Sequence, residues 1–193
     1  MISAVLTNIT QALNGHLNRK FQSRTDKVLL SGLVGPDGNA IIKEESALVL
    51  SIVNIEHETA RESNAGYVRL NDGGIGQQYP PVNINIYLLL SMLFNEKQYP
   101  EGLKWLSGAI GFFQSHPVFN HHNITGLPAS VSKITCEIVN LNIQDMSHFW
   151  GALGAKYQPS VIYKLRMLSI QEGSLPAELP QVSEAPETSA QTK

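Results

Sequence analysis

Three histidines that could bind a metal ion lie close together in the sequence, at His116, His121 and His122. Imidazole nitrogen is a common zinc ligand, and a zinc site needs three or four converging ligands. No cysteine lies nearby, and the adjacent side chains of His121 and His122 cannot easily point at one ion. We therefore interpret 116–130 as an exposed polar loop. A small metal-binding protein or enzyme that uses the His116–His122 loop is kept as an alternative.

The other residues of catalytic type do not form a set. Glu56, His57 and Glu58 resemble an acid–base cluster, but on a strand the two glutamates share one face and His57 takes the other. Cys136 shares its strand face with isoleucines, which predicts a small core residue rather than a nucleophile. The glycine-rich stretch 71–76 lacks a Walker lysine and the dinucleotide-binding spacing. The sequence thus predicts no active site, no cofactor and no metal site.

The composition narrows the class of protein further. The chain of 193 residues has a formal net charge of -2, and only 16% of its residues are charged. This balance argues against a nucleic-acid-binding protein, which needs clustered lysine and arginine to bind phosphate. The low charge is typical either of a surface that faces other protein subunits or of an ordinary low-charge monomer.

The sequence also gives no sign of secretion or membrane insertion. The N-terminus has no basic region followed by an apolar stretch, so we expect no signal peptide. The longest apolar run, Ile86–Leu90, is far too short to cross a membrane. A single cysteine permits no internal disulfide and fits a reducing cytosol. We therefore expect assembly in the cytoplasm.

Hydrophobic periodicity predicts a sheet flanked by helices. The helical segments are 2–20, 99–115 and 143–153, and the strands are 28–33, 47–55, 82–94, 131–141 and 160–170. Apolar residues at every even position of 82–94 favour a strand, although 88–93 contains good helix formers and a helix there stays open. Apolar residues on both faces of 47–55 indicate a strand covered on both sides, with Val53 and Ile55 on one face and Ile52 on the other.

We predict a single domain of the α/β (α+β) class over residues 1–172. Its central β-sheet is mostly antiparallel or mixed, and helices flank it in two layers. From Gly173 onward, proline and glutamate alternate with small residues, which cannot bury enough apolar surface to offset the entropy of ordering. We therefore predict that 173–193 is a disordered tail.

Two segments carry the candidate interface residues. The polar stretch 61–81 contains glycines and asparagine, and we expect a mobile loop that becomes ordered on contact with a neighbouring subunit. Arg166 alternates with apolar neighbours on the last strand and is expected to face an accessible side, so Arg166→Glu should spare the fold and weaken assembly. The candidate residues are Arg61, Tyr67, Arg69, Asn71, Asp72, Lys164 and Arg166.

Six strings of the sequence, taken in their order and spacing, carry a family likeness. They are Ile52–Glu56, Pro80–Leu89, Tyr99–Leu106, Phe112–Phe119, Phe149–Gly154 and Tyr157–Met167. Over roughly 1–170, the chain resembles the N-terminal cap domain of the cap, or tail-terminator, proteins of phage-tail-like contractile injection systems. Longer relatives carry further C-terminal sequence, where this chain has only its proline- and glutamate-rich tail.

The resemblance implies a phage tail-terminator-like fold and a structural function without enzymatic activity. It implies a homohexameric ring that closes the distal end of the inner tube and the outer sheath. The partners would be the chain itself and the tube and sheath subunits, with no nucleic acid and no membrane insertion. The protein would become part of the injection particle after cytoplasmic assembly. A monomeric assembly adaptor is a further alternative.

Overall fold

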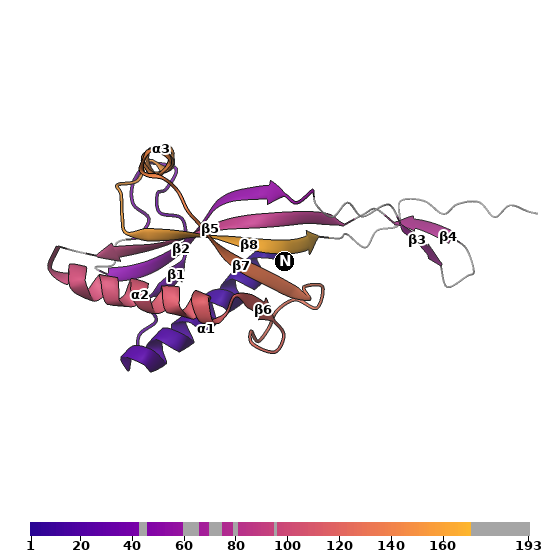
Figure 1. Cartoon of the computed structure of the whole chain (residues 1–193), viewed down its shortest axis with the longest axis horizontal. Coiled ribbons are helices and arrows are strands. Elements are labelled where there is room, and N and C mark those ends of the chain that lie inside the picture. The colour runs from indigo at the N-terminus through magenta and orange to yellow at the C-terminus, as the bar shows by residue number, and fades with distance from the viewer. Residues whose placement is uncertain (43–45, 60–65, 70–74, 79–80, 95, 171–193) are drawn as a thin grey trace, which may run out of the picture.

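The computed structural model of the chain describes residues 1–42, 46–59, 66–69, 75–78, 81–94 and 96–170 (Figure 1). The predicted disordered tail, 173–193, lies outside the described residues. Three candidate interface residues, Arg61, Asn71 and Asp72, also lie outside them.

The described chain begins with a helix, continues with five strands, and then combines helices and strands. The helices are α1 (Ile2–Phe21), the 3-10 helix η1 (Glu96–Gln98), α2 (Tyr99–Ser115) and α3 (Ile143–Leu153). The strands are β1 (Val28–Leu30), β2 (Ser46–His57), β3 (Gly66–Arg69), β4 (Ile75–Gln78), β5 (Val82–Phe94), β6 (Val118–Asn120), β7 (Lys133–Val139) and β8 (Ser160–Ile170).

Six strands form one mixed sheet in the order β1-β2-β5-β8-β7-β6. The short strand β1 runs parallel to β2, and the other neighbouring pairs are antiparallel. The prediction of an α+β domain around a mostly antiparallel or mixed sheet is confirmed. The period-two interpretation of 82–94 is also correct, because β5 stays a strand to Phe94 and no helix forms in its second half.

The main core lies between the sheet and the helices α1 and α2. Four successive even positions of β5 are fully buried there, namely Ile86, Leu88, Leu90 and Met92. One stripe of α1 packs against them, as its 3.6-residue spacing predicts. A Cβ added to Gly108 of α2 would lie 2.8 Å from the Phe21 ring, so the glycine permits the two helices to approach closely.

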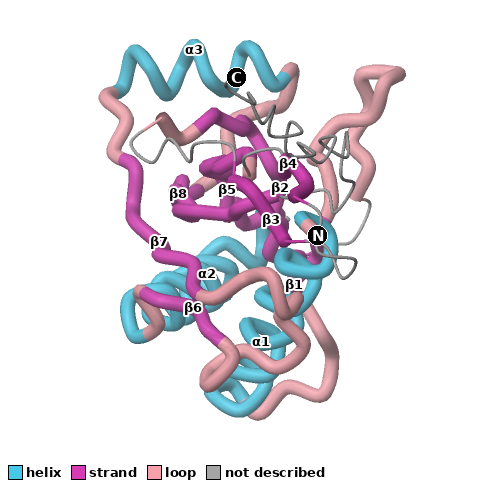
Figure 2. Tube along the Cα trace, turned by 90° about the vertical axis from the view of Figure 1, so that its right-hand side faces the viewer, coloured by secondary structure: helices cyan, strands magenta, loops and turns pink. Residues whose placement is uncertain are grey.

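A smaller core on the opposite face of the sheet corrects the two-layer prediction. Leu89 of β5 and Ile162 of β8 pack there against Trp150 of α3, so the sheet separates α3 from α1 and α2. Figure 2 shows α3 on one side and the other two helices on the opposite side. The domain therefore has three layers. Its third helix begins as predicted, because the Asn142 side chain accepts a hydrogen bond from the backbone N–H of Asp145 at 2.8 Å.

A β-bulge corrects the predicted faces of β2. Ile52 pairs with Leu88 and Asn54 with Tyr87, so Val53 is an extra residue in the ladder. The bulge returns Ile55 to the face of Ile52, and both side chains are more than 40% exposed, at 47% and 42%. The prediction that this strand is covered on both faces along its length is therefore wrong beyond Ser51. Strand β6, inside the predicted loop 116–130, was also not expected.

The Asn14 side chain attaches the edge strand β1 to α1. Its amide nitrogen donates to the carbonyl oxygen of Val28 at 2.9 Å, and its Oδ1 accepts from the Val28 N–H, also at 2.9 Å. Both residues are buried, with exposed fractions of 7% and 3%. A buried backbone group without a partner is costly, so this one amide satisfies two groups that β2 does not reach.

Asn14→Ala is therefore expected to lower the free energy of unfolding by about 2–4 kcal/mol, because both polar groups of Val28 lose their partner. Asn18→Ala, one turn later, serves as the control. The Asn18 side chain bonds to exposed Asp26, and its loss should cost less than about 1 kcal/mol. Urea unfolding of both variants measures the difference, and equal midpoints would contradict this role of Asn14.

Deletion of 173–193 should leave the cooperative fold intact, because the described residues of both cores, the last of which is Leu168, form closed clusters before the tail begins. We expect the thermal midpoint to change by no more than about 4 °C, which for a domain of this size is roughly 1 kcal/mol. Calorimetry of the full and the shortened chain tests this. A fall of ten degrees or more would show that the tail is part of the fold.

Candidate assembly surface

Polar side chains of β2, β5 and β8, together with Glu58 directly after β2, lie on the sheet face of Leu89. The register produces the arrangement, because Glu56 pairs with Asn85 across β2 and β5, and Tyr87 pairs with Lys164 across β5 and β8. Opposed residues on neighbouring strands project to the same face. We name this set the polar sheet face. It consists of Glu56, Glu58, Asn85, Tyr87, Lys164 and Arg166.

Glu56 contacts two members of the polar sheet face. The Tyr87 hydroxyl donates to its Oε2 at 2.7 Å, and the Lys164 ammonium nitrogen lies 3.4 Å from the same oxygen. The hydrogen bond with Tyr87, and after it the bond with Glu56, raise the pKa of Lys164. The Glu56 side chain is 44% exposed, and a pair so open to water contributes little to stability.

Glu58 forms the more protected half of the polar sheet face. It accepts a hydrogen bond from the Asn85 amide at 2.9 Å and one from the Arg166 guanidinium at 3.0 Å. The Glu58 side chain is only 11% exposed, whereas that of Arg166 is 41% exposed. Arg166 thus lies on an accessible face, as predicted, but its guanidinium already forms an ion pair with Glu58 of the same chain.

The spacing of the charges holds a signal that the sequence analysis missed. Glu56 near the end of β2 and Glu58 directly after β2 are two residues apart, the same step as Lys164 and Arg166 on β8, which lies two strands away. Opposite charges at equal steps on strands of one sheet can pair across the strand between them. The pairs join residues 108 apart in the sequence, so only the strand order reveals which charges meet.

The outer edge of β2 is open for half of its length. Strand β1 pairs only with Leu48–Leu50, and no other strand of the described chain pairs with 52–57 on that side. Exposed Ile52 and Ile55 lie along this stretch. An apolar edge with unpaired backbone groups is suited to accept a strand from another chain.

The predicted polar loop 61–81 contains a hairpin. Strands β3 and β4 pair antiparallel, with Tyr67 opposite Gln77 and Arg69 opposite Ile75. Figure 1 shows the hairpin beyond the end of the six-stranded sheet where β2 ends and β5 begins. Two candidate interface residues, Tyr67 and Arg69, therefore lie on β3, away from Lys164 and Arg166 on the sheet.

The histidine loop has a structural explanation in part. The His116 ring stacks on Phe112, with ring centres 4.6 Å apart, and its Nδ1 lies 2.9 Å from the Phe112 carbonyl oxygen at the end of α2. Among the described residues, no group of three or more His, Cys, Asp or Glu side chains is placed to hold a metal ion. Cys136 is buried in the main core, as predicted, and burial raises its pKa to about 12.

A family model described as the Pvc16 N-terminal domain matches residues 8–184 of the chain. The chain belongs to the Pvc16 N-terminal domain family. No curated protein matches it.

Two solved structures share the fold of this family member at low sequence identity. One is a cryo-EM structure of the sheath/tube terminator of an extracellular contractile injection system, PVC, in the extended state. It has a TM-score of 0.68 and 13% identity over all of this chain and 64% of that chain. The other is the tube-terminating cap of the anti-feeding prophage. It has a TM-score of 0.64 and 13% identity over 94% of this chain and 59% of that chain.

The resemblance to cap, or tail-terminator, proteins of contractile injection systems is therefore confirmed, as is the terminator-like fold. The chain spans about three fifths of the length of the two solved structures. The family match extends past β8 into the tail, to residue 184.

The Glu58–Arg166 pair revises the expectation that Arg166→Glu spares the fold. The substitution places a second carboxylate beside the nearly buried Glu58, and we expect it to cost about 1–2 kcal/mol, since exposure of Arg166 weakens the effect. The double variant Glu58→Arg with Arg166→Glu should recover part of this loss. Arg24→Glu, at an exposed position after α1, is the control for the charge change. Denaturant unfolding that finds Arg166→Glu as stable as the control would contradict the pairing.

Proposed function

We propose that this chain is a structural cap protein that terminates the tube and sheath at the distal end of a phage-tail-like contractile injection particle. The observation that carries the proposal is the match to the Pvc16 N-terminal domain family over 8–184. The fold shared with two terminators of such particles supports it. The role is binding and the control of assembly, without catalysis.

A terminator acts by presenting a surface that accepts the last subunit and offers nothing to the next. Tubes and sheaths grow by head-to-tail contacts, which do not close by themselves. The open edge of β2 supplies an acceptor of this kind, because a strand from a sheath or tube subunit can pair with the backbone of 52–57. The opposite end of the sheet ends in short β6, which gives little backbone for a second addition.

The proposed assembly is a homohexameric ring, since a cap must match the symmetry of a six-fold tube. Lateral contacts between identical copies fit the low fraction of charged residues, 16%. The β3–β4 hairpin, set beyond the sheet, is the element we propose to contact a ring neighbour or the sheath (Figure 1). Arg61, Tyr67, Arg69, Asn71 and Asp72 are its candidate contact residues. Lys164 and Arg166 are candidates on the polar sheet face.

The proposed location follows from the role. The chain would be made in the cytoplasm and then become part of the particle. None of the helices in the described part of the chain is long and apolar enough to cross a membrane.

A strain that lacks this protein should make particles of abnormal length, or unstable particles with few intact sheaths, because no subunit closes the growing end. Electron micrographs of the deletion strain test this, and a reconstruction of the wild-type particle end should show six copies. Normal particles from the deletion strain, or a wild-type end without this subunit, would refute the cap.

Complementation can then test the open edge. A chain with Ile52→Lys and Ile55→Lys should restore fewer intact particles than wild type, because charges along an edge oppose strand addition. Leu103→Lys is the matched control, since Leu103 is exposed on α2, away from the edge. Full rescue by the edge variant would exclude this edge as the contact while leaving the cap function in place.

A further inference from the structure

Helix α3 is attached to the sheet by much less buried surface than the other two α-helices. In this fully described helix Trp150 is the one buried residue, whereas α1 and α2 each bury seven. Met146, Phe149 and Leu153 pack against the smaller core but stay partly exposed. Ile143, in the first turn, has 90% of its surface exposed. The apolar area that holds α3 in place is therefore small.

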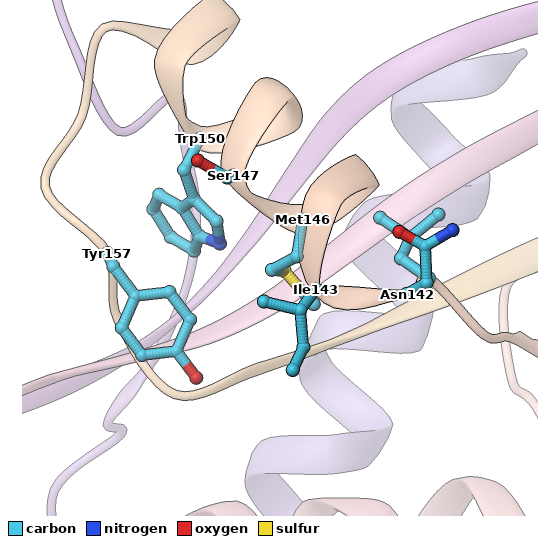
Figure 3. A pocket seen from close by; sticks show the side chains of 7 residues that line it. Asn142, Ile143, Met146, Ser147, Trp150 and Tyr157 are labelled. Atoms are coloured by element: carbon cyan, nitrogen blue, oxygen red, sulfur yellow. The ribbon is translucent and has the colours of Figure 1, made fainter.

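The packing around Trp150 is also incomplete. An apolar groove of about 480 Å³ lies beside α3, and Met146, Trp150 and Tyr157 are among the residues that line it (Figure 3). Side chains that border open space lose dispersion contacts on that side. The rings of Trp150 and Tyr157 meet edge to face with centres 5.7 Å apart, but Tyr157 itself is 62% exposed. The groove thus weakens the apolar contact that attaches the helix.

Hydrogen bonds do not attach α3 to the rest of the described chain. The bonds of the helix and its two caps all stay within 142–154, from the Asn142 cap to the N–H of Gly154, which donates to a carbonyl oxygen of the last turn. Helix α1 differs, because Asn14 bonds to both backbone polar groups of Val28 in β1. Apolar packing alone therefore holds α3 against the sheet.

Three buried polar atoms in this region have no hydrogen-bond partner among the described residues. They are the indole nitrogen of Trp150 and the hydroxyl oxygens of Ser91 and Ser160. Ser91 and Ser160 pair across β5 and β8, one step along the same face from the pair of Leu89 with Ile162. A buried polar group without a partner costs free energy, and it recovers this cost when water reaches it. These groups therefore favour a state in which the cover of this face has opened.

We propose that α3 leaves the sheet and unfolds as a separate unit while the rest of the domain stays folded, and that the unpartnered polar groups favour this opening. An α-helix of 11 residues is marginal by itself in water, so an undocked α3 loses its helical hydrogen bonds. Its ends permit the motion, because the backbone is extended at Asn142 and left-handed at Gly154. Elements held by few buried apolar contacts open in this way.

Opening of α3 changes the sheet face on which Lys164 and Arg166 lie. Leu89 and Ile162 lose their cover, and Ile162 is two residues from Lys164 on the same face of β8. An apolar strip then continues the polar sheet face. The opening is a conformational control on this surface, which goes beyond the cap function and does not depend on it.

Native-state hydrogen exchange of the full chain, followed by nuclear magnetic resonance from zero urea to just below the unfolding transition, tests the opening. The amides of 147–153 should exchange at least about a hundredfold faster than those of 107–113 in α2, and should share one opening constant. Helix α2 is the matched control, because it belongs to the same domain and buries seven residues. The rate for 147–153 should rise with urea, because opening exposes surface.

Two results of this experiment would overturn the proposal. The first is protection of 147–153 equal to that of 107–113, which would mean that α3 opens only when the whole domain unfolds. The second is fast exchange of 147–153 that does not depend on urea, because fraying of single residues exposes almost no surface.

The buried serines provide a second test. The double variant Ser91→Ala with Ser160→Ala removes the unpartnered hydroxyl groups, so the amides of 147–153 should exchange about fivefold more slowly. Ser51→Ala is the matched control, because Ser51 pairs with Leu89 on the same face but its hydroxyl donates to the carbonyl oxygen of Ser31. The control should not slow the exchange. Unchanged exchange in the double variant, or equal slowing in the control, would refute the role of the unpartnered groups.

Discussion

Burial of β5 on both of its faces is the constraint on which the rest of the structure depends. Its even positions from Ile84 to Met92 lie in the main core with α1 and α2, and Leu89 on the other face packs against Trp150 of α3. A strand with both faces buried by packed side chains is suited to a central position in the sheet, and β5 indeed lies between β2 and β8. Tyr87 packs at the margin of the smaller core while its hydroxyl bonds to Glu56, so the polar sheet face begins at this residue.

A β-bulge in each of the two strands that flank β5 changes which side chains lie on each face of the sheet. Val53 is the extra residue in β2, and β8 gains one residue between Leu165 and Leu168 opposite Ile84 and Ile86. After each bulge the side chains return to faces that simple alternation would not give them. The bulges thus allow Leu168 to rejoin the main core while Arg166 reaches Glu58 on the opposite face.

The parts of the fold that could be predicted from the sequence are those set by local patterns. The strand 82–94 follows from alternation, and α3 follows from the Asn142 cap and from Gly154, whose φ of 65° suits glycine at the helix end. The layer of α3 could not be predicted, because it depends on Leu89 and Ile162 from distant strands. The pairing of Arg166 with Glu58 depends on strand order and on a bulge, and neither has a signature in the local sequence. Short β6 has too few residues for a periodic signal.

The connection between β2 and β5 has a further consequence. His57 pairs with Ile84, so the segment from 58 to 83 leaves the sheet and returns to it at neighbouring points. The described residues of the two cores include none between 58 and 83, and the closure entropy of a connecting segment rises by only about 0.6 kcal/mol when its length doubles. Insertions between 60 and 80 should leave the register of β2 and β5 intact, provided that Glu58 keeps its bond to Arg166 and that Val82 and Asn83 keep their pairing with β8. Evolution can therefore exchange this segment as an independent module, and change what the domain recognises without a new fold.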